Sequence, residues 1–188
     1  VAQDLELTWI KMQKRFWSAI SDNGVIDQGD WTLSGFRKAL PRLTYSPPES
    51  LGISDIFTVG VGEWALAEVH SQLCQVGVLI ESLKVLDSIY PSGSITSLSP
   101  TQQSGHDATG VDVLGSRWAL EVYGGVSVKN MSKFLKDSNE LLRSGEFHHR
   151  YFACFADAWG KYEPKKVKVE LLPVRGAGIQ IVKVMQNT

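Results

Sequence analysis

The chain has 188 residues, of which 43% are hydrophobic, and it carries a formal net charge of −1. This length and apolar content suffice for one domain with a sizeable core. The near-neutral charge excludes nucleic-acid binding by a general excess of basic residues, so such binding would need a local basic patch. No apolar run reaches the ~18 residues of a membrane span, so no membrane partner is expected.

The first 50 residues are expected to form a helical portion of the domain. Large apolar residues recur at helical spacing over residues 4–20, and residues 31–40 form a second short helix that Pro41 ends. The core of the single domain, which spans residues 1–188, is expected over residues 60–188.

A long helix over residues 61–89 opens this core, because its apolar residues form a nearly continuous helical stripe. Residues 91–110 contain many turn formers and few large residues, which predicts a long loop. The stretch "GVDVLGSRWALEVYGG", residues 110–125, then predicts a hairpin. Its first strand is expected over residues 110–115, its turn at Ser116 and Arg117, and its second strand over the residues that follow.

The C-terminal third combines a helix with strands. A helix is expected over residues 130–147, with Gly145 as its stop. Residues 149–159 fit a buried strand or a helix, and their aromatic content favours a strand. Alternation of apolar and polar residues predicts a final hairpin over residues 165–186. Together these elements predict an α/β (α+β) fold with a central mixed sheet flanked by helices.

The two cysteines, Cys74 and Cys154, lie in apolar segments. Two thiols form neither a disulfide framework nor a zinc site. They are therefore interpreted as buried free cysteines, which is typical of an intracellular, reducing compartment.

Asp112 and Glu121 interrupt the two arms of the predicted hairpin, one on each arm. One interpretation is a pair of solvated carboxylates, and the other is a pair that binds one divalent cation. Mg²⁺ prefers hard oxygen ligands, usually one or two carboxylates completed by water and phosphate oxygens. The apolar neighbours indicate a buried hairpin, where an unpartnered carboxylate is costly. Asp112 and Glu121 are therefore predicted as ligands of Mg²⁺ or Mn²⁺ in metal-assisted phosphodiester hydrolysis.

The order of elements resembles the core of the PD-(D/E)xK nuclease superfamily: a helix, a strand with Asp, a turn, a strand with (Asp/Glu)-x-Lys, then a helix and further strands. Asp112 matches the Asp of this pattern and Glu121 the second acid, whereas Tyr123 stands where the family has Lys. The resemblance implies a restriction-endonuclease-like fold and a magnesium-dependent endonuclease. It also implies that Lys129 supplies the ammonium group from a migrated position, with Glu68 or Glu63 as an accessory acid.

A narrower resemblance runs through "ALEVYGGVSVKNMSKFLKDSNELLRSGEF", residues 119–147. Its Glu, its glycines and the helix with basic residues and Phe are similar to the nuclease-like domain of Crinkler effectors and the related retrotransposon hot-spot proteins. The similarity covers roughly residues 60–155. It implies an effector that acts on nucleic acid, often inside the nucleus of a host cell.

Lys129, Lys133 and Lys136 are spaced so that they share about one face of the helix after the hairpin. Such a row is typical of a solvated helix face. The functional interpretation is a ridge that contacts nucleic-acid phosphates, with DNA preferred to RNA. By contrast, His106, in the loop before the hairpin, is interpreted as an exposed residue rather than a ligand.

A non-catalytic module is the alternative function: a nuclease fold that has lost its Lys and binds nucleic acid or a host protein. Tyr123 in the Lys position and the near-neutral charge favour it. The carboxylates of Asp112 and Glu121 discriminate between the two functions, since acids too far apart to share one ion, or on opposite sides of the sheet, favour the binding module.

Overall fold

The computed structural model describes residues 6, 7, 9, 10, 14, 44, 45, 64–98, 105–125, 131–162, 166–174 and 178–186. Within the helix expected over residues 4–20, the five described positions are helical. The rest of that helix and the whole of the helix expected over residues 31–40 lie outside the described residues.

Six strands form one mixed sheet in the order β3-β4-β5-β6-β8-β7. Neighbouring strands are antiparallel except β5 and β6, which are parallel. The strands are β3 (Ser94–Leu98), β4 (Ala108–Val111), β5 (Arg117–Tyr123), β6 (His149–Phe155), β7 (Lys168–Leu172) and β8 (Ile179–Met185). A separate two-stranded pair joins β1 (Thr44–Tyr45) to β2 (Trp64–Ala65).

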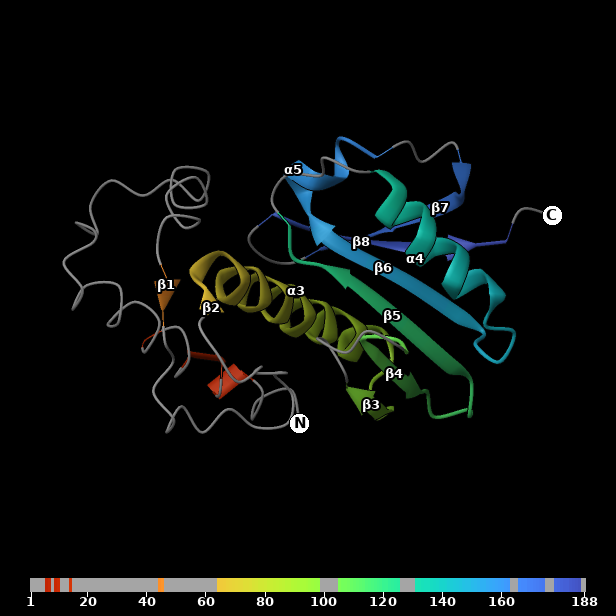
Figure 1. Cartoon of the computed structure of the whole chain (residues 1–188). Helices are drawn as coiled ribbons and strands as arrows, with labels where there is room; N and C mark the ends of the chain where they lie inside the picture. Colours follow the sequence, from red (N-terminus) through yellow and green to blue (C-terminus); the bar gives the residue numbers. More distant parts are fainter. Residues whose placement is uncertain are drawn as a thin grey trace.

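The helices are α3 (Leu66–Ile89), α4 (Met131–Arg143) and the single turn α5 (Ala156–Trp159). The predicted mixed sheet flanked by helices is therefore confirmed (Figure 1). Among the described residues, no helix combines the length and the apolar character needed to cross a bilayer.

The two long helices cover opposite faces of the sheet. On β5, Trp118 and Leu120 belong to the apolar cluster that includes the buried face of α3. Ala119, which alternates with them, belongs to the cluster around Phe134 of α4. Because successive side chains of a strand point to opposite faces, the sheet is the middle layer of three (Figure 1).

The buried stripe of α3 follows the helical period that the sequence shows. Val76, Leu79, Ile80 and Leu83 are all buried, at spacings of three and four residues. Burial of each such side chain contributes roughly 1.5–3 kcal/mol relative to exposure in water. This stripe fixes which side of α3 faces the sheet, and hence where its polar residues emerge.

The hairpin differs from its predicted form. Strand β4 ends at Val111, and the turn occupies residues 112–116, so the strand expected over residues 110–115 and the turn expected at Ser116 and Arg117 are wrong. The loop expected over residues 91–110 also contains a strand, β3.

The reason lies in the side chain of Asp112 and in the backbone of Gly115. Asp112 Oδ1 accepts hydrogen bonds of 2.8 Å from the backbone N–H groups of Leu114 and Ser116. Gly115 has a φ of 81°, which favours glycine. These local interactions turn the chain despite the apolar Val113 and Leu114, and Leu114 is left 87% exposed.

The C-terminal elements follow the sequence closely. Residues 149–159 form β6 and then the turn α5, and β7 and β8 form the predicted antiparallel hairpin. Helix α4 ends at Arg143, a little before Gly145. The Arg150 side chain explains this end, because its Nε donates to the Leu141 carbonyl at 2.7 Å and its Nη2 to the Ser144 carbonyl at 3.1 Å.

Candidate functional site

Glu121 lies within β5, on the face of the sheet that α4 covers. Its neighbours on that face, Ala119 and Tyr123, belong to the apolar cluster around α4. Glu121 itself is only 8% exposed. A carboxylate so far out of water needs partners that hydrogen-bond it or balance its charge.

The first partner is Asp107, which the sequence did not single out. Ala108 pairs with Leu120 across the β4–β5 hairpin, so Asp107 lies at the level of Glu121. Asp107 is 7% exposed. Its Oδ2 accepts a hydrogen bond of 2.7 Å from the backbone N–H of Val122.

Helix α3 contributes the side chain that holds the other oxygen of Asp107. Gln75 Nε2 donates to Asp107 Oδ1 at 3.2 Å. The close approach of α3 to the end of β5 depends on Gly124, because a Cβ there would overlap the backbone of Gln75. The helix α3 and the strand β5 therefore both donate hydrogen bonds to this carboxylate.

The two acids influence each other strongly. Burial, and next the negative charge of Glu121, raise the pKa of Asp107 to about 8. A hydrogen bond with Glu121 adds to this rise, whereas the Val122 N–H and the charge of Lys133 oppose it. A negative charge on one of two neighbouring carboxylates disfavours ionisation of the other. The pair is therefore electrostatically suited to bind positive charge.

Lys133, in the first turns of α4, supplies a cation beside this pair. Its Nζ lies 2.7 Å from Asp137 Oδ2 and 5.9 Å from the centre of the Tyr123 ring. Burial lowers the pKa of Lys133, but the hydrogen bond and charge of Asp137 and the charges of Asp107 and Glu121 outweigh burial and raise it above the ordinary value. The ammonium group therefore stays protonated.

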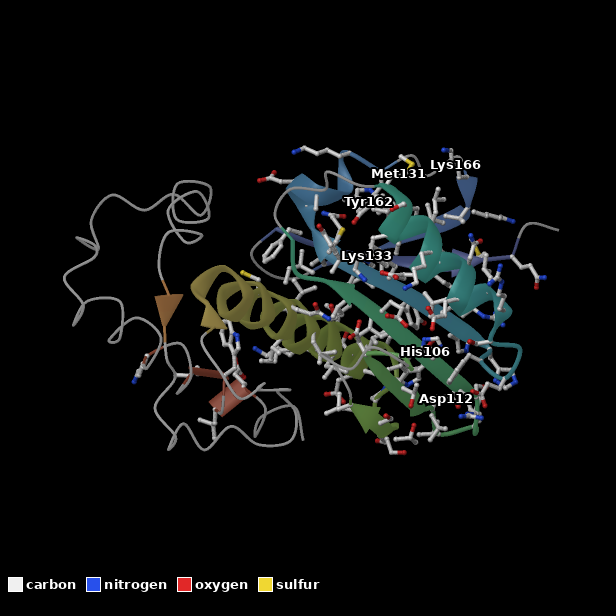
Figure 2. The ribbon with its side chains drawn as sticks, in the orientation of Figure 1. His106, Asp112, Met131, Lys133, Tyr162 and Lys166 are labelled. Carbon is white, nitrogen blue, oxygen red and sulfur yellow. The ribbon has the colours of Figure 1, made fainter. Side chains whose placement is uncertain are left out.

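His106 is also part of the site, which corrects its interpretation as an exposed loop residue. Its Nδ1 lies 2.6 Å from Glu121 Oε1, and its side chain is 10% exposed. In Figure 2, His106 lies near β5 and Lys133 near the beginning of α4.

Asp112 is not brought to Glu121. It lies in the hairpin turn, as Figure 2 shows, beyond the last pair of the β4–β5 ladder. Val111, the residue before Asp112, pairs with Arg117, which at ~3.3 Å per residue lies about 13 Å along β5 from Glu121. Ligands of one Mg²⁺ each lie about 2 Å from the ion, so Asp112 and Glu121 do not share a cation in this arrangement. Asp107, rather than Asp112, is the acid that interacts with Glu121.

The other predicted site residues are only partly placed. Lys129 and Glu63 lie outside the described residues, and so does the side chain of Glu68, whose backbone lies in α3. Lys136 is exposed on α4, whereas Lys133 turns to Asp137 and the acids. Of the two lysines of the predicted ridge that the structure describes, Lys133 lies at the site and Lys136 at the surface.

Two carboxylates, Asp107 and Glu121, are the oxygen donors of the site that could hold a hard divalent cation. Within the described ranges, no three His, Cys, Asp or Glu side chains are grouped so that they could hold a metal ion. Mg²⁺ typically takes one or two carboxylates and completes its octahedron with water and substrate phosphate oxygens. The carboxylates of Asp107 and Glu121 meet that requirement, and Mn²⁺ accepts the same oxygen ligands.

Comparison with known proteins does not extend this description. No family model, no curated protein and no solved structure matches the chain. The functional argument therefore depends on the site itself.

Proposed function

We propose that the chain is a metal-dependent nuclease-like domain that hydrolyses nucleic-acid phosphodiesters, with Asp107 and Glu121 as ligands of Mg²⁺ or Mn²⁺. One observation carries the proposal: two buried carboxylates meet across neighbouring antiparallel strands, and the Lys133 ammonium group lies within reach of their charge. Such an arrangement has a structural cost unless a cation compensates it.

Each group of the site has a separate role in the proposed reaction. When bound, the cation polarises a phosphoryl oxygen and lowers the pKa of a water molecule. Because its pKa is raised, Lys133 does not accept a proton; instead it orients the attacking water or stabilises negative charge on the phosphate. Gln75 and the Val122 N–H hold Asp107 in place.

The resemblance to the PD-(D/E)xK superfamily supports the proposal in an altered form. The helix α3, the hairpin β4–β5, the helix α4 and the strand β6 follow one another in the order of that pattern. Asp107 stands for the first acid instead of Asp112, and Glu121 for the second. Tyr123 stands in the Lys position, and Lys133 supplies the ammonium from α4 instead of Lys129. The resemblance also makes nucleic acid the proposed partner, with DNA preferred to RNA.

A cleavage assay tests the proposal. Single- and double-stranded DNA and RNA are incubated with the protein and Mg²⁺ or Mn²⁺, with and without a chelator. We expect cleavage that requires the metal and falls at least about 100-fold in Asp107→Asn, Glu121→Gln and Lys133→Gln, because each change removes a charge that acts on the phosphate or its metal. The matched control is Asp112→Asn, which should retain cleavage.

Two results would overturn the proposal. Cleavage that persists in Asp107→Asn or in the presence of chelator would place the chemistry elsewhere. No cleavage of any substrate by the folded wild-type protein would favour the non-catalytic binding module, which the separation of Asp112 from Glu121 and the tyrosine at position 123 both support.

A further inference from the structure

His106 has no assigned role in the proposed metal binding or water activation, yet both of its ring nitrogens lie within hydrogen-bond distance of other side chains. Its Nδ1 lies 2.6 Å from Glu121 Oε1, and its Nε2 lies 3.1 Å from Ser144 Oγ. The His106 and Phe147 rings pack in a T-shaped contact, with ring centres 5.1 Å apart. A largely buried imidazole held at both nitrogens and packed against a second ring has a fixed orientation.

Ser144, the partner of His106 Nε2, is itself held in place by hydrogen bonds. Ser144 directly follows α4, and its Oγ also lies 3.0 Å from the Glu140 carbonyl. The Arg150 Nη2 on β6 donates to the Ser144 carbonyl at 3.1 Å. His106 therefore connects the carboxylate on β5 to the end of the helix that carries Lys133.

We propose that His106 is a positioning residue for Glu121. Its Nδ1–H donates to Oε1 and thereby fixes the carboxylate plane, so that the other oxygen is directed to the cation shared with Asp107. Since it concerns the same centre, this role rests on the proposed function. Partners that orient metal-ligating side chains typically contribute a factor of about 10–100 to metal affinity.

The test measures Mn²⁺ affinity by electron paramagnetic resonance, a readout that needs no cleavage. His106→Asn keeps an amide N–H close to the position of Nδ1, whereas His106→Gln moves the same amide toward the position of Nε2 and Ser144. We expect His106→Ala and His106→Gln to weaken Mn²⁺ binding at least about tenfold and His106→Asn to restore it to within about threefold of wild type. Ser144→Ala, which keeps the Glu121 contact, should have an intermediate effect.

Equal affinity of wild type and His106→Ala would overturn the positioning role. If His106→Ala does not fold, the Asn and Gln variants decide, because equal affinities in those two would also overturn it. Asp107→Asn separates this outcome from failure of the proposed function. If Asp107→Asn abolishes Mn²⁺ binding and the His106 variants do not affect it, only the role of His106 is wrong. If Asp107→Asn binds Mn²⁺ normally, the metal site itself is wrong.

Discussion

Asp107 shows how one buried acid couples the site to the stability of the fold. Its carboxylate is satisfied by the Val122 N–H and Gln75, yet burial and Glu121 disfavour its charge. The group therefore holds a proton in the folded protein at a pH where it is ionised in the unfolded chain. Such a difference makes the free energy of unfolding depend on pH.

The pH dependence gives the first prediction. The folded-state pKa of about 8 exceeds the ordinary 3.8, so the stabilising contribution is fully present below pH 3.8 and is lost as pH rises toward 8. Over that window, Asp107→Asn should gain stability relative to wild type by up to about 1.4 kcal/mol per pH unit. Urea unfolding of wild type and Asp107→Asn at pH 5, 6, 7 and 8 measures this difference. Parallel curves for Asp107→Asn would contradict the assignment.

A second prediction concerns the role of Asp112 in the turn. Its Oδ1 accepts two backbone hydrogen bonds there, so Asp112→Ala should lower the free energy of unfolding by about 1–2 kcal/mol. The same variant should bind Mn²⁺ as wild type does. Chemical denaturation measures the free energy of unfolding, and a Mn²⁺ titration measures the affinity. Weakened Mn²⁺ binding in a folded Asp112→Ala protein would indicate that Asp112 is a metal ligand after all.

At the scale of elements, the position of a turn decides which acids meet. Backbone pairs across the hairpin are symmetric about Leu114, so residue 107 falls opposite residue 121. A turn centred between Ser116 and Arg117 instead places Asp112 opposite Glu121. The run Asp112-Val-Leu-Gly115 carries the signal that selects the observed turn, because Asp is favoured at the first and Gly at the fourth position of a β-turn. Because Val113 and Leu114 are apolar, the sequence analysis predicted a strand at these positions instead of a turn.

The contact between α3 and the end of β5 gives a third prediction. A methyl group at position 124 overlaps the Gln75 backbone, so Gly124→Ala should destabilise the protein by about 1–3 kcal/mol and weaken Mn²⁺ binding by displacing Gln75. Gly145→Ala is the matched control, because nothing lies within 4 Å of the added Cβ and its stability should be nearly unchanged. Thermal unfolding of both variants measures the contrast, and equal melting temperatures would contradict the packing argument.

At the scale of the whole molecule, the sequence predicts layers better than it predicts contacts between them. Hydrophobic periodicity located α3, α4 and the β7–β8 hairpin, because a buried face imposes its period on the sequence. It did not reveal that Gln75 reaches Asp107 or that His106 reaches Ser144. Those pairs are 32 and 38 residues apart, and only the packing of helices on the sheet brings them together.

The reactivity of the buried Cys154 thiol measures how often the central sheet unfolds. Cys154 on β6 is fully buried, and burial raises the pKa of its thiol to about 12, whereas Cys74 on α3 is partly exposed. We therefore expect Cys154 to react with a thiol reagent only through global unfolding, and Cys74 to react faster. Reaction rates of Cys74→Ser and Cys154→Ser proteins across denaturant concentrations measure the two thiols separately. Rapid reaction of Cys154 without denaturant would contradict the buried central sheet.

The proposed metal centre is tested most directly by anomalous scattering from crystals grown or soaked with Mn²⁺. We predict one anomalous peak between the carboxylates of Asp107 and Glu121, within about 2–2.5 Å of an oxygen of each. That peak should be absent in Asp107→Asn crystals treated in the same way. A peak at Asp112, or no peak near Asp107 at saturating Mn²⁺, would contradict the proposed metal site.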